Sequence, residues 1–356
     1  MEFELNELEC QIAELAESLM RDHSTPERLL ALENSGNRVD LELWGALREA
    51  GLTAVGIVDD QDGAGPGFSE ACLVLEQAGR TTAAVPLLSH TVALHTLQRC
   101  EARAELQEFV RTEGWLAVSA RSDRGNSLRL ESGRVSGEIS AVPFATGAVA
   151  YLLPVRASGA WTLCLIRAGQ ADSSVEEQLC TDKSPAGKLV LTGANAKELG
   201  GPERLDWMRQ RLLAGTCSIQ SGVVEEAIRM TAAYVSEREA FGVKIGTFQA
   251  VSQRMADAYI DSMTLQLLSR HTASVLARQD DGLVDALSAK LTAGDVGHRV
   301  LHVCQQVHGG IGHDRGYALW RYAVAAKQNE LATMSSAEAA AALGRVVATD
   351  PERVAL

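Results

Sequence analysis

Two segments of the chain carry side chains suited to binding an anionic ligand, and the first is residues 236–249. It places Arg238, Lys244, Gly242 and two phenylalanines between two helical patterns. A guanidinium suits phosphate because its planar fork pairs bidentately with anionic oxygens. The alternative is an ordinary helix C-terminus, where cations favour the negative end of the helix dipole and Gly242 ends the helix. Taken alone, the local pattern favours the helix end.

The second segment is residues 305–313, which is rich in glycine, glutamine and histidine. Gly309 and Gly310 follow a helical pattern, and glycine lets backbone or ligand approach closely. Gln306 offers both a donor and an acceptor to a nucleotide edge. The alternative is a glycine-rich turn between helices, which the cluster alone favours.

Composition narrows the possible functions. The chain has 356 residues, 46% hydrophobic and 22% charged, which excludes wholesale disorder. Its 33 basic and 46 acidic residues give a net charge of −13, and this argues against nucleic-acid binding and a polybasic membrane anchor. No run of about 18 apolar residues could span a bilayer, and the N-terminus lacks a signal pattern. Seven cysteines without C-x-x-C spacing fit reduced thiols, so we expect a cytoplasmic protein.

Hydrophobic periodicity predicts an α+β fold of three domains: an N-terminal helical domain (1–112), a middle antiparallel β domain (113–197) and a C-terminal four-helix bundle (198–356). The first domain includes a helical pattern that ends at Gly79. The expected strands are 115–120, 128–130, 134–139, 148–155, 161–166 and 188–191. The expected bundle helices are 204–236, 248–279, 284–307 and 319–347.

The two ligand-binding segments together resemble the C-terminal domain of acyl-CoA dehydrogenases. The resemblance rests on Arg238-x-x-Phe241-Gly242, Phe248-Gln249-Ala250-Val251, Ala256-Asp257 and Gln306-Val307-His308-Gly309-Gly310-Ile311-Gly312. Near the N-terminus, Gly51-Leu52, Gly63-Ala64-Gly65, Glu70 and 75–80 match the same family. The order of helical, β and helical domains agrees, so the resemblance covers essentially the whole chain.

The resemblance implies a flavoprotein that uses FAD to oxidise an acyl-CoA substrate. In the family, a glutamate takes the α-proton of the thioester while the β-hydride passes to the flavin. The resemblance further implies an oligomer, an electron-transfer acceptor and FAD held largely by the neighbouring subunit. The positions that would bind the diphosphate and adenosine are Arg238, Phe241, Gln249, Gln306, Gly309 and Gly310.

The middle domain departs from the family where the flavin ring would lie. The usual Thr-Glu and Gly-Ser-Asp segments are replaced by 115–123. Ala141 stands where the family has a tryptophan, and Pro143 has no backbone N–H to offer a flavin oxygen.

The catalytic base is also missing from its usual position. Counting 24 residues from Gly309 reaches Thr333, which cannot abstract this proton. Ser335 and Ser336 stand for the Thr-Ser that follows the base in the family, and the resemblance also assigns them to cofactor binding. A second family position for the base falls in 208–213, which holds no carboxylate. Glu330, about one helical turn before Thr333, is a weak candidate, and a solvated helix face is the alternative that we favour.

A metal site is not expected. Asp295, His298 and His302 share one helix at compatible spacing, but Arg299 occupies the position of a zinc-protease glutamate. Polar side chains at a helix–helix or subunit contact explain the pattern better.

Three hypotheses follow. The first is the base-lacking subunit of an α2β2 acyl-CoA dehydrogenase, whose homologous partner supplies the glutamate and the flavin-ring contacts. The second is a self-sufficient homo-oligomer in which Glu330 or another carboxylate is the base. The third is a non-catalytic scaffold that keeps the fold.

Overall fold

The computed structural model describes residues 5–36, 38–57, 67–122, 125–171 and 173–354. The chain forms two compact units, each assembled from separate stretches. Unit 1 comprises Met1–Arg28, Cys72–Ala83 and Leu213–Leu356, and unit 2 comprises Leu29–Ala71 and Ala84–Leu212. The domain boundaries at 112 and 197 stay a prediction. Residues 63–65 and Asp123 of the family motifs lie outside the described residues.

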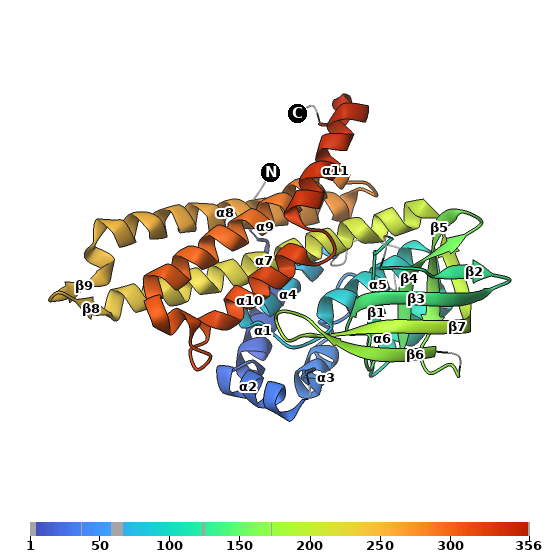
Figure 1. Cartoon of the computed structure of the whole chain (residues 1–356), viewed down its shortest axis with the longest axis horizontal. Helices are drawn as coiled ribbons and strands as arrows, with labels where there is room; N and C mark the ends of the chain where they lie inside the picture. Colours follow the sequence, from blue (N-terminus) through green and yellow to red (C-terminus); the bar gives the residue numbers. More distant parts are fainter. Residues whose placement is uncertain (1–4, 37, 58–66, 123–124, 172, 355–356) are drawn as a thin grey trace. The chain divides into compact units, whose positions relative to one another are not determined.

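Unit 2 contains a seven-stranded sheet and most of the N-terminal helices. Its helices are most of α2 (Pro26–Ser35), α3 (Leu41–Glu49), α5 (Leu87–Arg99) and α6 (Arg103–Arg111). The strands are β1 (Leu116–Val118), β2 (Arg129–Glu131), β3 (Arg134–Pro143), β4 (Ala150–Ala157), β5 (Ala160–Arg167), β6 (Ser173–Leu179) and β7 (Pro185–Gly200). They run in the order β1-β4-β2-β3-β7-β5, β6 pairs with β7, and β4 also pairs with β5 (Figure 1).

The predicted sheet needs two corrections. β1 pairs in parallel with β4, and so does one residue of β2, so the sheet is mixed although most of its pairs are antiparallel. β6 was not predicted, because five of its seven residues are exposed and it lacks the apolar alternation of a half-buried strand. The sheet core is built by β4 and β5, whose central residues are buried on both faces.

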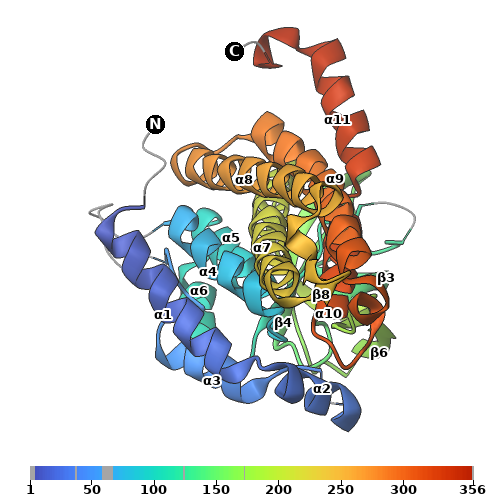
Figure 2. The same ribbon diagram turned by 90° about the vertical axis from the view of Figure 1, so that its left-hand side faces the viewer.

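Unit 1 is helical, apart from one two-stranded hairpin. Its long helices are α7 (Pro202–Glu237, from Leu213 onward), α8 (Gln249–Arg278) and α9 (Leu283–His308), which run side by side (Figures 1 and 2). α1 (Glu7–His23), part of α4 (Phe68–Thr81), α10 (Leu319–Leu331) and α11 (Ser336–Thr349) complete it. A buried apolar cluster joins α7, α8, α9 and α10.

The single helix predicted over 319–347 is wrong. The chain leaves the helical conformation at Ala332, Thr333 adopts a φ of +61°, and α11 begins at a new capping box in which Ser335 and Glu338 exchange hydrogen bonds. The break was not predicted because alanines on both sides of it favour a continuous helix. The first half of α11 packs on α9, where Ala339 is buried against Ala286 and Leu287, and its C-terminal end extends away from the other helices of unit 1 (Figure 2).

The expected end of a helix at Gly79 is also wrong, because α4 continues to Thr81. Gly79 instead allows α4 to touch α7, since a β-carbon there would lie 2.0 Å from the carbonyl oxygen of Ile219. The contact is reciprocal, for a β-carbon on Gly222 would lie 2.0 Å from the carbonyl oxygen of Glu76. Each helix therefore presents a glycine to the backbone of the other.

Candidate functional site

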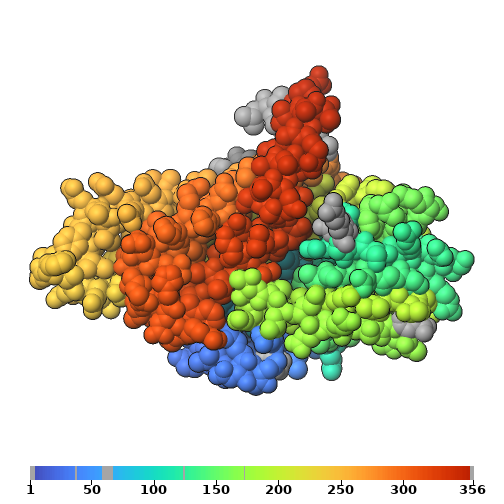
Figure 3. All heavy atoms as spheres, viewed as in Figure 1, coloured from blue at the N-terminus to red at the C-terminus, as the bar shows by residue number. Residues whose placement is uncertain are grey.

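The connection between α7 and α8 is a short hairpin. α7 ends at Glu237, and β8 (Glu239–Ala240) pairs with β9 (Val243–Lys244). Phe241 and Gly242 form the turn with φ of +53° and +81°. Gly242 therefore closes a hairpin rather than a helix, contrary to the alternative interpretation of the sequence. The hairpin lies at the tip of unit 1 (Figures 1 and 3).

Of the two cationic side chains at the hairpin, Lys244 is paired within the described residues and Arg238 is not. The ammonium of Lys244 forms an ion pair with Glu239 at 2.9 Å and donates to the carbonyl oxygen of Glu237 at 2.9 Å. The guanidinium of Arg238 is exposed and has no hydrogen bond or ion pair with any residue in the described ranges. Phe241 is 98% exposed, with its ring 6.4 Å from that of Phe248. Gln249 is exposed in the first turn of α8.

The end of α9 is fixed against α7. Gly309 ends the helix with a φ of +64°, and the 3-10 turn η2 (Gly309–His313) follows, as the paired glycines predicted. His308 stacks on Tyr234 with 4.3 Å between ring centroids, and its imidazole hydrogen-bonds to the Cys304 carbonyl and the Tyr317 hydroxyl. Tyr234 is one turn before Arg238, and its carbonyl accepts from the N–H of Arg238 at 2.8 Å. The stack therefore joins the second segment to the last turns of α7, directly before the first segment.

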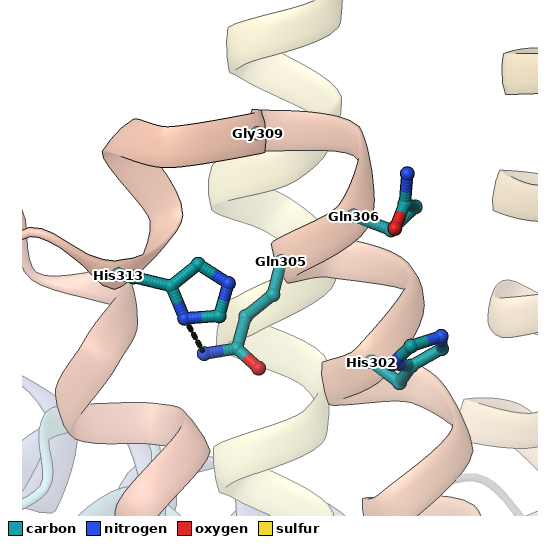
Figure 4. A pocket seen from close by; sticks show the side chains of 5 residues that line it. All are labelled: His302, Gln305, Gln306, Gly309 and His313. Atoms are coloured by element: carbon teal, nitrogen blue, oxygen red, sulfur yellow. Dashed lines mark hydrogen bonds between the residues drawn. The ribbon is translucent and has the colours of Figure 1, made fainter.

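A surface pocket opens beside the end of α9 (Figure 4). Its lining residues are His302, Gln305, Gln306, Gly309 and His313. The amide nitrogen of Gln305 donates to Nδ1 of His313 at 3.3 Å. Sequence reasoning selected Gln306 and Gly309 for cofactor binding. It included Gln305 and His313 only as members of the 305–313 segment, and it considered His302 only for a metal site.

The family base position lies in the turn between α10 and α11. Thr333 is exposed there, and its side chain has no acid–base function. The carboxylate of Glu330 forms an ion pair with Lys327 on the same helix. Buried Lys290 holds the end of α10 by donating to the carbonyls of Asn329 at 2.5 Å and Glu330 at 3.1 Å. The turn is thus well anchored but contributes no unpaired carboxylate.

The two serines of this turn differ from each other. The Ser335 hydroxyl is part of the capping box of α11. The Ser336 hydroxyl is buried without a hydrogen-bond partner and packs on Gly294, where a β-carbon would lie 1.8 Å from it. Their assignment to cofactor binding stays a prediction.

At the positions where the family contacts the flavin ring, polar groups of this chain form hydrogen bonds within the protein. The N–H of Ala141 donates to the side-chain oxygen of Gln178 at 2.8 Å, and Ala141 has a φ of +56°. The guanidinium of Arg209 donates to the carbonyl of Ala120 and the hydroxyl of Ser122, in the segment that replaces the family's Gly-Ser. These groups do not fit an isoalloxazine ring. The exposed Arg238 and the amide-lined pocket do fit the diphosphate and nucleoside end of FAD.

Neither a metal centre nor a membrane span is found in the described ranges. They contain no cluster of three histidine, cysteine or carboxylate side chains placed to hold an ion. Arg299 forms an ion pair with Asp261 at 2.8 Å, and His298 and His302 are exposed. The described helices include none that is long and apolar enough to cross a bilayer.

Comparisons with known proteins agree with this arrangement. Residues 6–111 match the N-terminal domain of acyl-CoA dehydrogenases and 203–335 match the C-terminal domain. The chain is 30% identical to acyl-CoA dehydrogenase FadE27 of Mycobacterium tuberculosis, covering 99% of this chain and 100% of that protein.

Two solved structures are also similar. The ChsE4-ChsE5 complex from Mycobacterium tuberculosis matches with a TM-score of 0.91 and 30% identity, over 99% of this chain and 100% of that chain. A Tcur3481-Tcur3483 steroid ACAD variant matches with a TM-score of 0.89 and 31% identity, over 97% and 99%. The helical, β and helical order of the fold and the motifs of the α7–α8 and α9 segments therefore have one explanation: the chain belongs to the acyl-CoA dehydrogenase family, whose members are oxidoreductases acting on acyl-CoA.

Proposed function

We propose that this chain is the base-lacking subunit of a heteromeric acyl-CoA dehydrogenase that forms an α,β-unsaturated acyl-CoA. The observation that carries the proposal is an asymmetry. Thr333 occupies the base position and Glu330 is paired with Lys327, whereas Arg238 is exposed and without a partner in the described ranges. A homologue that had lost its enzymatic activity altogether would be expected to lose the catalytic base and the FAD-binding residues together.

In this proposal the chain contributes residues to the binding site of an FAD whose flavin ring is held by a homologous subunit. Arg238 would pair with the diphosphate, and Phe241 and Gln249 would contact the same end of the cofactor. Gln306, Gly309 and Gly310 would hold the nucleoside end, because the glycines have no side chain to obstruct a ligand. When bound, FAD supplies the hydride acceptor of the reaction, and an electron-transfer acceptor would reoxidise it.

The partner would supply the glutamate that removes the α-proton. One similar structure is named as the ChsE4-ChsE5 complex and another carries the paired name Tcur3481-Tcur3483, and this supports a heteromer. The second of them is described as a steroid ACAD, so a bulky, steroid-like acyl-CoA is the substrate class that we propose. We place the enzyme in the cytoplasm, since reduced, scattered cysteines suit that compartment.

The test begins with the chain purified alone on a sizing column while its visible absorption is recorded. We expect no flavin band from the chain alone, and a yellow, active complex after co-expression with a homologous subunit that has the family glutamate. A flavin-containing, active homo-oligomer would overturn the proposal in favour of the self-sufficient enzyme. If the chain stays inactive and binds no flavin with every homologous partner, the proposal is wrong and the non-catalytic scaffold is the remaining hypothesis.

Two variants of the active complex locate the base. Glu330→Gln in this chain should leave kcat within about twofold, because its carboxylate has no part in the reaction. Replacing the partner's family glutamate by glutamine should lower kcat by at least 100-fold, in line with the usual contribution of general-base catalysis. A large loss from Glu330→Gln would assign the base to this chain.

A further inference from the structure

The helix α8 has apolar residues on two opposite faces. One face packs into the core of unit 1 and includes Ala258 and Leu265, which are buried. The other face is exposed, by 58%, 63%, 38% and 41% for Tyr259, Ile260, Met263 and Leu267. A helix on the surface of a single chain normally has one apolar face, and a helix that is apolar all round is buried by something else. α8 runs along the outside of unit 1, and the described part of the chain does not cover its second face (Figures 1 and 2).

The exposed apolar residues have the spacing of a helix that pairs with another helix. Ala256, Ile260, Met263 and Leu267 are all exposed and follow one another at intervals of four, three and four residues. These intervals are those of the a and d positions along the seam of two packed helices. Single apolar residues on a surface need no explanation, but this row covers about three turns of helix. The covering element that fits it is a second helix lying along α8.

The charge of this face favours a second copy of the chain as the occupant. The chain carries a net charge of −13, so two copies repel each other through most of their surface. The seam and its margins hold no acidic or basic residue, at positions 252, 256, 259, 260, 263, 264 and 267. An uncharged, apolar face can meet its own copy across a twofold axis without opposing like charges.

The charged residues around the seam have partners within the chain or lie to one side. Asp261 is on the flank toward α9, where its carboxylate pairs with Arg299 at 2.8 Å, and Asp257 is one turn before it on the same flank. Beyond the end of the seam, the guanidinium of Arg270 pairs with buried Glu76 at 3.2 Å. The seam itself therefore stays uncharged along its whole length.

We propose that this face of α8 binds the same face of a second copy of the chain, with the two helices antiparallel across a twofold axis. The inference rests on the proposed function for the number of copies, since an α2β2 enzyme contains two copies of this chain. Antiparallel pairing keeps the two exposed Arg238 hairpins apart, whereas parallel pairing would bring both cations together. Ile260 then lies opposite Met263 of the second copy. The contact joins two αβ pairs and leaves each hairpin free for the homologous subunit.

The experiment adds a charge to the seam in the complex with the homologous subunit. Light scattering on a sizing column measures the mass while flavin absorption is recorded. Ile260→Glu should halve the mass, from α2β2 to αβ, because the contact would bury a carboxylate without a partner. The flavin content per αβ pair should stay the same, which also shows that the variant is folded. Leu41→Glu is the matched control, since Leu41 is 56% exposed on α3 and its replacement should not change the mass.

A second substitution tests the antiparallel arrangement. When Met263→Lys is added to Ile260→Glu, the ammonium of each copy would lie opposite the carboxylate of the other, so the tetramer should form again. An αβ pair in this double variant would overturn the antiparallel arrangement. An unchanged mass in Ile260→Glu would overturn the inference. So would loss of the homologous chain together with the flavin, because it would assign the face to that chain.

The same variants separate this inference from the proposed function. An active, flavin-containing heteromer with a single copy of this chain would keep the function and overturn the inference. If no heteromer forms with any homologous partner, the proposed function fails and the chain alone tests the inference. A dimer that Ile260→Glu converts to a monomer would then support the α8 contact, and a monomeric wild type would overturn it.

Discussion

The ring of Tyr234 in α7 stacks on the imidazole of His308 in α9, with 4.3 Å between centroids and 21° between the ring planes. His308 is also held by the Cys304 carbonyl and the Tyr317 hydroxyl, so the imidazole has a fixed orientation. The stack joins two turns that are 74 residues apart in sequence. The stack therefore connects the helix end before the β8–β9 hairpin to the helix end before η2.

Removal of this stack should affect binding as well as stability. Tyr234→Ala should lower the free energy of unfolding by about 1–3 kcal/mol, because it removes the aromatic contact and leaves space beside His308. It should also weaken several-fold the binding of ADP, the nucleoside diphosphate end of FAD, since the two segments lose their common support. Tyr234→Phe keeps the ring and is the control. Equal ADP affinity in the alanine variant, measured by calorimetry below its unfolding temperature, would show that the stack is only structural.

The turn that carries the family base position is strained. Thr333 is β-branched and has a φ of +61°, a conformation that costs roughly 1–2 kcal/mol for residues other than glycine. Thr333→Gly should therefore raise the free energy of unfolding by about 1 kcal/mol, and it should leave the turnover of the active complex unchanged. Gly309→Ala is the opposite control: Gly309 has a φ of +64° and a ψ of −142°, a backbone conformation that is nearly restricted to glycine, so alanine should destabilise by at least as much. Chemical denaturation measures both, and a destabilised Thr333→Gly variant would contradict the prediction.

The contact between α4 and α7 should tolerate no side chain at Gly79 or Gly222. Gly222→Ala should destabilise the protein by more than 2 kcal/mol, because its β-carbon would meet the carbonyl of Glu76 at 2.0 Å. Gly45→Ala is the control within α3, where nothing lies within 4 Å and alanine favours the helix by up to about 1 kcal/mol. Thermal unfolding should give a lower Tm for the first variant and an equal or higher Tm for the second. Similar Tm values in both would show that the helices can separate at no cost.

Two buried histidines should make stability depend on pH. Burial lowers the pKa of His90 to about 3 and that of His95 to about 4. Above pH 6.5 these groups are neutral in both the folded and the unfolded chain. Below pH 6.5 the unfolded chain takes up protons that the folded chain cannot, so stability falls as the pH falls toward these lower values.

At pH 5 each histidine should cost about 2 kcal/mol relative to pH 7. His95→Gln should reduce the difference in unfolding free energy between pH 7 and pH 5, because glutamine does not titrate. An unchanged pH dependence in His95→Gln, measured by urea denaturation, would show that His95 is protonated in the folded protein.

The sequence established more of the helices than of the sheet. Apolar periodicity placed α7, α8 and α9 to within a few residues, because a long helix repeats its pattern many times. β6 was missed, since its exposed residues are held in place by pairing with β7 rather than by burial. The break at Thr333 was missed for a related reason: the residues on both sides favour helix, and the break is fixed by the capping box at Ser335 and by Lys290.

The sequence by itself determined the family, because Arg238, Gln306 and the paired glycines are local motifs that need no knowledge of their contacts. It also determined that the base position holds a threonine. The tertiary structure alone decided what depends on neighbours distant in sequence. It decided that Gly79 is a helix contact rather than a helix end, and that His302 and His313 share a pocket. Such roles are set by which backbone or side chain lies opposite, and a linear pattern does not record this.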